Sequence, residues 1–433
     1  MGRLAGNIGT KLRTLLSFPR FASDKQQASS LFFLFIVLTL FCSNIYPSLL
    51  TGFDHAALEE KYMNHIADPD NFQWFLSDND LYAYAGWRYV TGASPDDINL
   101  EHPPLAKYLI GISEVLFNNP NVIGAAFGVL SLIILYELSK RLLGHSLFAL
   151  VPVYMLSLER IFIGISSASM LDIYLVLFLL LSIYCFSGGD SDAKLLAGAI
   201  ALGLASACKL IAVLAVPSLI LPVITRRRRK AWKFIVQVML AAALVYCLCY
   251  ARFFMDGRSV EDFLEMQCRM VSMQYGMRCG RSYAPGRLVL TLLTGIIGPE
   301  TRNLIYVDEA AKEIITIVTR HGLSIATEFN LLTWPVCFSA AVLSTFHAIK
   351  RRNTELLQSC AYFFSFLVPL SFAQSFVWYL LPVLPIGFLL LTTNLKKIVK
   401  ESNGRLSSIL MFIYMGALLL WLRFLILPSF IEL

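Results

Sequence analysis

The stretch EHPPLAK at residues 101–107 places an acid, a histidine, two prolines and a lysine directly before an apolar run. Pro104 can begin a helix there, because the first helical turn leaves its N–H groups unbonded and proline has a fixed, helical φ. His102 precedes that N-terminus, and Lys107 lies one turn inside it. Free N–H groups and nearby cations suit a phosphate group. We expect His102 and Lys107 to bind phosphate; the alternative is an interfacial helix in which Lys107 only reaches toward water.

Two carboxylates lie upstream, in the segment LSDNDLYAYAGWRY. Carboxylates can serve in acid–base chemistry, so Asp78 and Asp80 are candidate catalytic groups. Most carboxylates at an aqueous surface are simply solvated. By themselves, these two acids do not identify an enzyme.

Two further charges lie next to apolar segments. Asp172 begins the run DIYLVLFLLL, and Lys209 interrupts a long apolar stretch in SACKLIAVLAVP. An ionisable side chain at membrane depth is costly and is a functional candidate by default. At the membrane boundary the same side chains could instead extend to water, and that structural alternative stays open.

The composition that surrounds these residues is that of an integral membrane protein. Of the 433 residues, 57% are hydrophobic, and the mean hydropathy is +0.65. These values exceed the apolar share of a soluble globular chain. The net charge of +7 resides in short clusters between apolar runs, such as RRRRK at 226–230, which is typical of cytoplasmic loops. This distribution argues against nucleic-acid binding.

The nine cysteines form no CxxC pair and no Cys/His cluster. The sequence therefore demands no metal site and predicts no cofactor, although a divalent ion is compatible with it. Cys268 and Cys279 both lie in a long polar loop. They could form a disulfide if that loop is extracytoplasmic.

Apolar runs of membrane-spanning length predict an all-α polytopic membrane protein with about eleven transmembrane helices. The stretch 195–224 is too long for one helix, so we expect two short helices that meet at Lys209. The remaining predicted spans are 31–50, 120–139, 146–165, 168–186, 232–254, 328–348, 356–373, 377–394 and 407–428.

These spans predict a domain organisation with the candidate residues on one side. We expect a cytoplasmic segment 1–30, a core of about seven helices at 31–254 with an outer loop 51–119, a second outer loop 255–327, and C-terminal helices at 328–433. This arrangement puts the basic clusters on the side of the N-terminus, as the positive-inside rule requires. The active site would then be extracytoplasmic, in a plasma or endoplasmic-reticulum-type membrane.

Amphipathic helices are expected in both outer loops. The helix that begins at Pro104 carries an apolar stripe of Leu105, Leu109, Ile112 and Leu116, so it should lie along the membrane surface. The run GRLVLTLLTGIIG in the second loop is too short to span and should be an interfacial helix or re-enter.

Five motifs in order along the chain resemble the GT-C superfamily of polyprenyl-phosphate-sugar glycosyltransferases. They are the first-loop acid, EHPPLAK, LDIYLVLF, the lysine-centred ACKLIAVLAVP and the late WYLLPVLP. The pattern is most similar to the protein O-mannosyltransferases, with the lipid A aminoarabinose transferases as relatives. The resemblance implies transfer of a sugar, mannose in the nearest branch, from a polyprenyl or dolichyl phosphate to an acceptor hydroxyl, with inversion.

The resemblance also implies roles for single residues. Asp80 would be the base, with Asp78 as the alternative counterpart. Glu101 and Asp172 would position sugar or acceptor. The phosphate would be held by His102, Lys209 and Lys107.

The second outer loop lacks the large insert and the histidine segment of the eukaryotic enzymes, so the acceptor could be protein Ser/Thr, a lipid or a glycan. Membrane lipids are the other expected partners. The competing hypothesis is a transporter or flippase of a lipid-linked sugar, but such proteins commonly show inverted repeats, and none is visible here. A non-catalytic scaffold is a further alternative, disfavoured by the charged residues named above.

Overall fold

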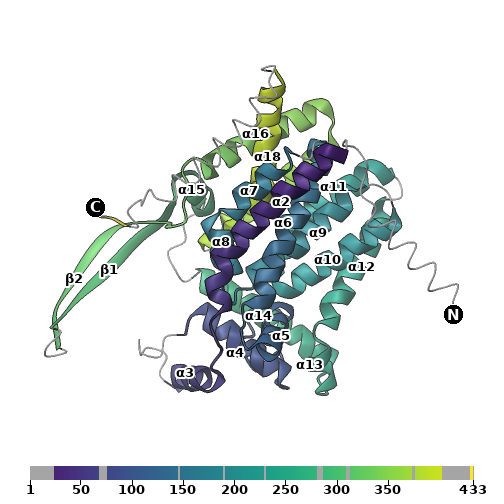
Figure 1. Ribbon diagram of the computed structural model, residues 1–433. Coiled ribbons are helices and arrows are strands. Elements are labelled where there is room, and N and C mark those ends of the chain that lie inside the picture. Colours follow the sequence, from purple (N-terminus) through teal and green to yellow (C-terminus); the bar gives the residue numbers. More distant parts are fainter. Residues whose placement is uncertain are drawn as a thin grey trace.

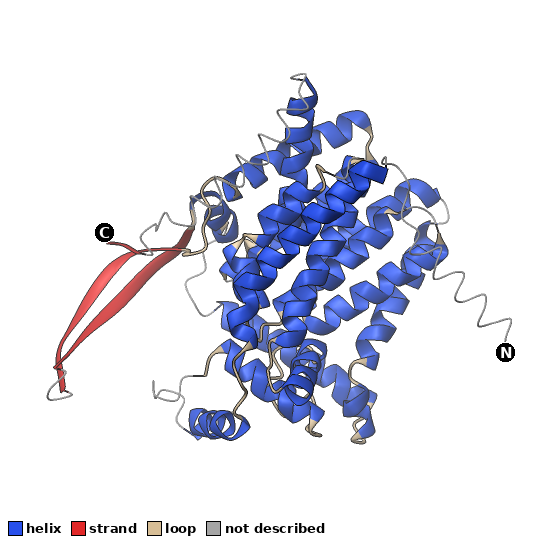
Figure 2. Cartoon of the chain, viewed as in Figure 1, coloured by secondary structure: helices blue, strands red, loops and turns tan. Residues whose placement is uncertain are grey.

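The computed structural model describes residues 24–67, 76–144, 147–188, 191–228, 231–279, 286–308, 313–372, 376–401 and 430–432. They form a helical bundle with a long β-hairpin that projects from one side (Figures 1 and 2). The predicted all-α polytopic architecture is confirmed for the bundle. The predicted N-terminal segment 1–30 and the predicted span 407–428 lie wholly or largely outside the described residues.

Apolar helices build the bundle. They are α2 (Asp24–Ile45), α6 (Val122–Leu143), α7 (Leu150–Ser157), α8 (Arg160–Ser166), α9 (Asp172–Ser187), α10 (Asp192–Cys208), α11 (Val216–Arg227), α12 (Ala231–Leu248), α16 (Trp334–Arg351), α17 (Thr354–Leu370) and α18 (Leu384–Glu401). Four continuous helical stretches are long and apolar enough to cross a membrane: Gln27–Leu49, Val122–Leu143, Leu210–Arg227 and Ala231–Leu248. The number of eleven spans stays a prediction.

Two helix breaks shape the bundle, and one of them was predicted. α10 ends at Cys208, Lys209 is extended, and a 3-10 helix, η3 (Leu210–Ala215), leads into α11. The expected single helix over 146–165 is wrong, because Glu159 is extended and separates α7 from α8. Arg160, exposed at the start of α8, donates a hydrogen bond to the carbonyl of Thr327 at 2.9 Å.

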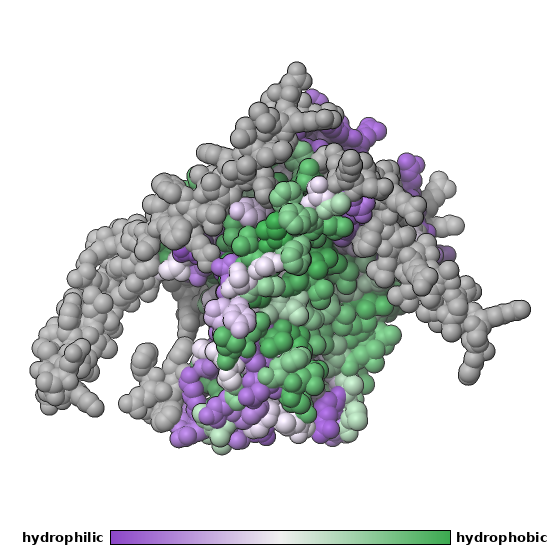
Figure 3. Space-filling view, in the orientation of Figure 1, coloured by the Kyte–Doolittle hydropathy of each residue, from purple (hydrophilic) through white to green (hydrophobic). Residues whose placement is uncertain are grey.

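The basic clusters gather at one end of the bundle. Arg141 donates to the carbonyl of Tyr184 at the end of α9, Lys396 donates to the carbonyl of Leu143 at the end of α6, and Arg226 pairs with Glu355 at the start of α17. Figure 3 shows hydrophobic side chains over the middle of the visible face and hydrophilic ones at the end formed by the loop helices. The predicted grouping of cations is confirmed; which compartment this end faces stays a prediction.

Short helices cover the opposite end (Figure 1). They are α3 (His55–Ala67), α4 (Asp78–Val90), α5 (Leu105–Phe117), α13 (Ala251–Met255) and α14 (Val260–Cys279). α5 begins directly after Pro104, as predicted. Its apolar residues Ile112 and Leu116 are exposed, which fits a helix whose outer side meets lipid.

α4 and α5 cross where each has a glycine. A Cβ on Gly111 would lie 2.1 Å from the carbonyl oxygen of Gly86, and a Cβ on Gly86 would lie 2.6 Å from the carbonyl oxygen of Lys107. Such distances are far below van der Waals contact. The two backbones can therefore approach this closely only with glycine at both positions.

The second outer loop differs from its all-helical expectation. Only Arg287–Thr294 (α15) of the stretch 286–298 is helical, because Gly295 has φ +77° and ends the helix. β1 (Ile296–Asp308) and β2 (Glu313–Ile325) then form an antiparallel hairpin, to which β3 (Phe430–Glu432) adds. The Ile-, Val- and Thr-rich sequence EIITIVT favours a strand over a helix.

The disulfide that Cys268 and Cys279 could have formed is absent from the described part of the chain. Cys268 and Cys279 lie eleven positions apart on the single helix α14, which separates their Cα atoms by roughly 16 Å. A disulfide needs Cα atoms within about 7 Å. Cys268 is a free, exposed thiol.

Candidate active site

A buried ion pair joins two bundle helices at the end covered by α3–α5. Asp172 stands in the first turn of α9, and Lys209 stands at the break after α10. The Lys209 Nζ atom lies 2.9 Å from both carboxylate oxygens of Asp172, and the side chains are 4% and 0% exposed. Both sequence candidates at membrane depth are thus brought together, and each satisfies the other's charge.

Tyr379, from the C-terminal third of the chain, packs against Lys209 of this pair. It belongs to a short 3-10 helix, η5 (Val377–Leu380), and its ring centroid lies 5.2 Å from the Lys209 Nζ atom, a cation–π distance. Tyr379 is only 4% exposed, so it belongs to the interior of the protein. Its neighbour Trp378 stacks on Phe376.

The inner face of α4 adds a carboxylate to this cluster. Asp78 is exposed to solvent at the start of α4. The protein around it raises its pKa by desolvation, an effect that Lys209 opposes and Asp172 reinforces. Tyr82, one turn further on and buried, has a pKa raised well above its usual value by burial and then by Asp78, Asp172 and Glu101. These three acids therefore surround one tyrosine.

Asp80 points the other way. Two residues along a helix correspond to a rotation of about 200°, so Asp78 and Asp80 lie on opposite faces of α4. The Asp80 carboxylate pairs with Lys61 of α3 at 2.6 Å. The Asp80 N–H is capped by the Ser77 hydroxyl, which fixes where α4 begins. The two candidate bases thus have different partners.

Glu101 and His102 of the EHPP segment lie near the inner face of α4. His102 contacts the Tyr82 ring edge-on, with centroids 5.9 Å apart. Glu101 is half-buried, and burial followed by the charge of Asp78 raises the pKa of its carboxyl, while Lys107 lowers it. Asp78, Glu101 and His102 are therefore neighbours.

Lys107 is bonded to the loop that precedes α5. Its side chain is fully buried. Its Nζ atom donates to the Asn99 carbonyl at 2.5 Å, the His102 carbonyl at 2.8 Å and the Asn99 side chain at 3.0 Å. It could reach a phosphate only by giving up these bonds. The expected reach toward water is wrong, since Lys107 is fully buried, and phosphate binding by Lys107 stays a prediction. In this structure Lys107 shapes the loop that presents Glu101 and His102.

The arrangement offers an accessible carboxylate beside buried, fixed charges. A reacting hydroxyl could meet Asp78 from solvent, while the Asp172–Lys209 pair and His102 supply oriented charge. The sequence analysis missed Tyr82 and Lys61. Tyr82 could have been found from its spacing of four residues from Asp78 on one helix, whereas no local pattern identifies Lys61.

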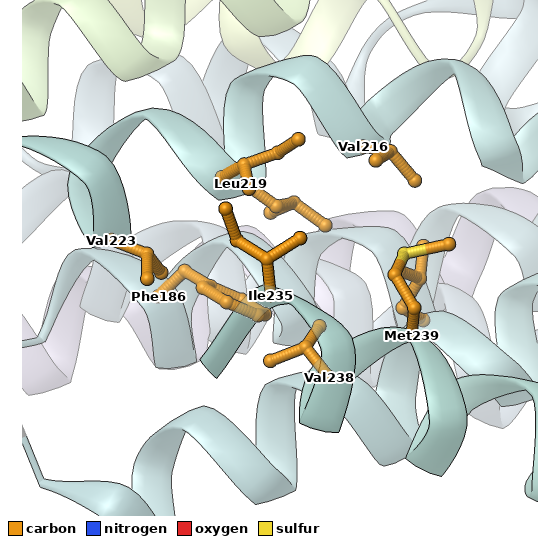
Figure 4. A pocket seen from close by; sticks show the side chains of 9 residues that line it. Phe186, Val216, Leu219, Val223, Ile235, Val238 and Met239 are labelled. Atoms are coloured by element: carbon orange, nitrogen blue, oxygen red, sulfur yellow. The ribbon is translucent and has the colours of Figure 1, made fainter. Parts of the chain in front are cut away.

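A separate apolar cleft lies elsewhere in the bundle (Figure 4). It is a narrow cleft between α9, α10, α11 and α12. Its lining includes Phe186, Leu219, Ile235 and Met239. Phe186 is fourteen residues after Asp172 on α9, or about 21 Å along the helix. The cleft has no polar side chain and is not the carboxylate site.

The sequence and the fold of this chain are similar to those of known proteins. Residues 101–251 match the family described as dolichyl-phosphate-mannose-protein mannosyltransferase. The ArnT structure from Cupriavidus metallidurans bound to undecaprenyl phosphate is 14% identical, with a TM-score of 0.57 over 85% of this chain and 60% of that one. The apo ArnT structure is 16% identical, with a TM-score of 0.52 over 74% and 55%.

A more distant enzyme has a similar structure. The Archaeoglobus fulgidus oligosaccharyltransferase is 12% identical, with a TM-score of 0.52 over 92% of this chain and 55% of that one. No curated protein sequence matches the chain. The chain spans 55–60% of the length of these solved structures. It therefore has the fold of the GT-C superfamily of membrane glycosyltransferases, and its residues 101–251 match the dolichyl-phosphate-mannose-protein mannosyltransferase family.

Proposed function

We propose that the protein is a membrane glycosyltransferase that moves a sugar from a polyprenyl-phosphate donor to an acceptor hydroxyl. One observation carries the proposal: Asp78 lies near the buried Asp172–Lys209 pair, and Tyr82 lies between these charges and the Glu101–His102 segment, at one end of a GT-C bundle. A hydroxyl would attack the anomeric carbon as the polyprenyl phosphate leaves. The new bond forms on the face opposite the leaving group, so the anomeric configuration inverts.

We assign the base to Asp78. It is open to an incoming acceptor, and its raised pKa makes it a better proton acceptor than an ordinary aspartate. Asp80 is the weaker candidate, because Lys61 already neutralises its carboxylate at 2.6 Å. A positioned base contributes about 10²–10⁴-fold to the rate. The rate should fall with falling pH as Asp78 is protonated, at a higher pH than for an aspartate whose pKa the protein does not shift.

The leaving phosphate gains negative charge as the glycosidic bond breaks. Lys209 and His102 are the cations that would stabilise it, more in the transition state than in the ground state. Asp172 holds the Lys209 ammonium in place through both carboxylate oxygens. Glu101, next to Asp78, would position the sugar or the acceptor.

The donor is proposed from the relatives. ArnT binds undecaprenyl phosphate, which is the leaving group of such a transfer, and the family that matches residues 101–251 is named for mannose on dolichyl phosphate. Mannose on a dolichyl-type phosphate is therefore the narrower proposal. The acceptor would be a Ser/Thr hydroxyl of a protein, or a hydroxyl of a lipid or glycan. The site would face the extracytoplasmic side, because the basic clusters gather at the other end.

A direct test uses the purified protein in liposomes with labelled dolichyl-phosphate-mannose or undecaprenyl-phosphate-linked sugar, with peptides, lipids and glycans as acceptors. We expect acceptor-dependent release of free polyprenyl phosphate, and an inverted anomeric configuration in the product by NMR. Movement of intact donor across the bilayer without any release would support the transporter hypothesis and refute the proposal.

A further inference from the structure

The second outer loop reaches back onto the loop that carries Glu101. The Gln274 Nε2 atom of α14 donates to the Glu101 carbonyl at 3.1 Å, and Arg258 pairs with Asp96 at 3.0 Å. Leu100 packs against a buried cluster on the same side, formed by Tyr250, Phe253, Phe263 and Met266. α14 thus holds the segment 96–101 from outside, and its last polar contact falls on a residue of the candidate site.

α14 has three faces when its residues are placed at the helical period of 3.6. Phe263, Met266 and Met270 are buried, and their side packs on the protein. A second face carries the charged residues Glu261, Glu265 and Arg269. Between the two lies an exposed apolar stripe of Val260, Leu264 and Val271, which are 67%, 59% and 55% exposed. A helix in solution would rarely leave such a stripe uncovered.

Exposed apolar residues also lie on the helices that lead to α14. α12 is one of the helices long and apolar enough to cross a membrane, and Leu240, Leu244 and Leu248 form an exposed row along it. Met255, 79% exposed, lies in the short α13 between the two helices. Because exposed apolar side chains recur along the chain from the spanning helix to α14, we identify the occupant of the stripe as the lipid bilayer.

We propose that α14 rests on the membrane surface through Val260, Leu264 and Val271, and that this membrane-seated helix holds Glu101 in position through Gln274. Gln274 is then a positioning residue, because it acts on the reaction only through Glu101. The positioning role of Gln274 rests on the proposed glycosyltransferase function. The contact between α14 and the membrane does not.

The lipid contact can be tested with a matched pair of neighbouring positions. In a background with Cys42, Cys268 and Cys279 replaced by serine, an environment-sensitive fluorophore is attached to Leu264→Cys or Glu265→Cys in nanodiscs that hold one copy of the protein. We expect spin-labelled lipids to quench the probe at 264 several-fold more than the probe at 265, and aqueous iodide to show the reverse order.

Equal quenching of both probes by iodide would overturn the lipid contact. Protection of position 264 only in discs that hold two copies would identify a second copy of the chain as the occupant, and would overturn it as well. Neither result depends on whether the protein transfers sugar.

The positioning role is tested with Gln274→Ala and Gln274→Lys, since lysine keeps a donor. Loss of one neutral hydrogen bond corresponds to about 3–10-fold. We expect Gln274→Ala to lower kcat by that factor with an unchanged donor KM and to speed hydrogen exchange in residues 96–101. Gln274→Lys should restore both, and Glu265→Gln on the charged face should change neither.

Unchanged kcat and unchanged exchange in Gln274→Ala would overturn the positioning role. If the wild-type protein transfers no sugar, the proposed function fails by itself. The exchange measurement then still decides whether Gln274 holds the segment.

Discussion

The two faces of α4 differ in what they contact. The inner face presents Asp78 and Tyr82 to a buried pair of charges. The outer face presents Asp80 and Arg88 to α3 in ion pairs whose side chains are between 33% and 44% exposed. Asp78 and Asp80 are two residues apart and of the same type. The phase of the helix, and not proximity in sequence, separates a candidate base from a residue that attaches a peripheral helix.

The largest loss of stability is expected at the buried Asp172–Lys209 pair, which lies on the side of the inner face of α4. Lys209→Met leaves the fully buried Asp172 carboxylate without its cation, which should lower the free energy of unfolding by about 3–5 kcal/mol. The measurement is denaturant unfolding in detergent. The double variant Asp172→Asn, Lys209→Met is the control, because removal of both charges should cost less than removal of Lys209 alone. An equal or larger loss in the double variant would contradict a charge-pair origin.

The α4–α5 crossing that positions the inner face should be the next most sensitive feature. Gly111→Ala would place a Cβ 2.1 Å from the Gly86 carbonyl oxygen, and such overpacking typically costs about 1–3 kcal/mol. Gly164→Ala is the matched control, because a Cβ there meets nothing within 4 Å. Thermal unfolding of both variants should show a loss only for Gly111→Ala. Equal melting temperatures would mean that the helices do not cross this closely.

The buried side of α5 should make stability depend on pH through Glu114. This side chain is 2% exposed, and within the described part of the chain neither of its carboxylate oxygens has a hydrogen-bond partner. Burial raises its pKa from 4.5 to about 9. Between these values the unfolded chain has lost the proton that the folded chain keeps, so stability falls as pH rises, by about 1.4 kcal/mol per pH unit.

Glu114→Gln removes the titrating group, so it should flatten this dependence. Unfolding measured from pH 5 to pH 9 should show a smaller slope in the variant than in the wild type. Parallel slopes would show that Glu114 ionises in the folded protein as it does in solution.

The smallest change in stability is expected on the outer face of α4. Glu59 and Arg88 are 3.4 Å apart and both partly exposed, so Glu59→Gln should change the unfolding free energy by about 0–1 kcal/mol. The change should shrink further in high salt. A loss as large as that of Lys209→Met would remove the distinction between the two faces.

Several parts of the fold could be predicted because they depend on local sequence. Pro104 fixed the start of α5, and the excessive length of 195–224 around Lys209 indicated a break. The break at Glu159 has no comparable length signal, since 146–165 is long enough for one helix. The hairpin follows from Gly295 and a β-branched run, a pattern that was outweighed by the apolar character of 286–298.

The structure brings together several side chains that the sequence named as candidates, but their geometry could be predicted less well, and their roles stay a prediction. Asp172, Lys209, Glu101 and His102 were named from their types and positions. The partners of Asp78 and Asp80 could not be assigned, because they depend on where α4 begins and on α3, whose Lys61 is remote in sequence. The Cys268–Cys279 pairing failed for a related reason: one continuous helix keeps the two residues apart.

The central claim is that the inner-face Asp78, and not the outer-face Asp80, takes the proton of the acceptor. The most direct measurement is the rate of sugar transfer from a polyprenyl-phosphate donor by Asp78→Asn and Asp80→Asn, side by side at one pH. The account predicts a loss of about 10²–10⁴-fold for Asp78→Asn and of less than about tenfold for Asp80→Asn. Full activity in Asp78→Asn together with a large loss in Asp80→Asn would contradict it.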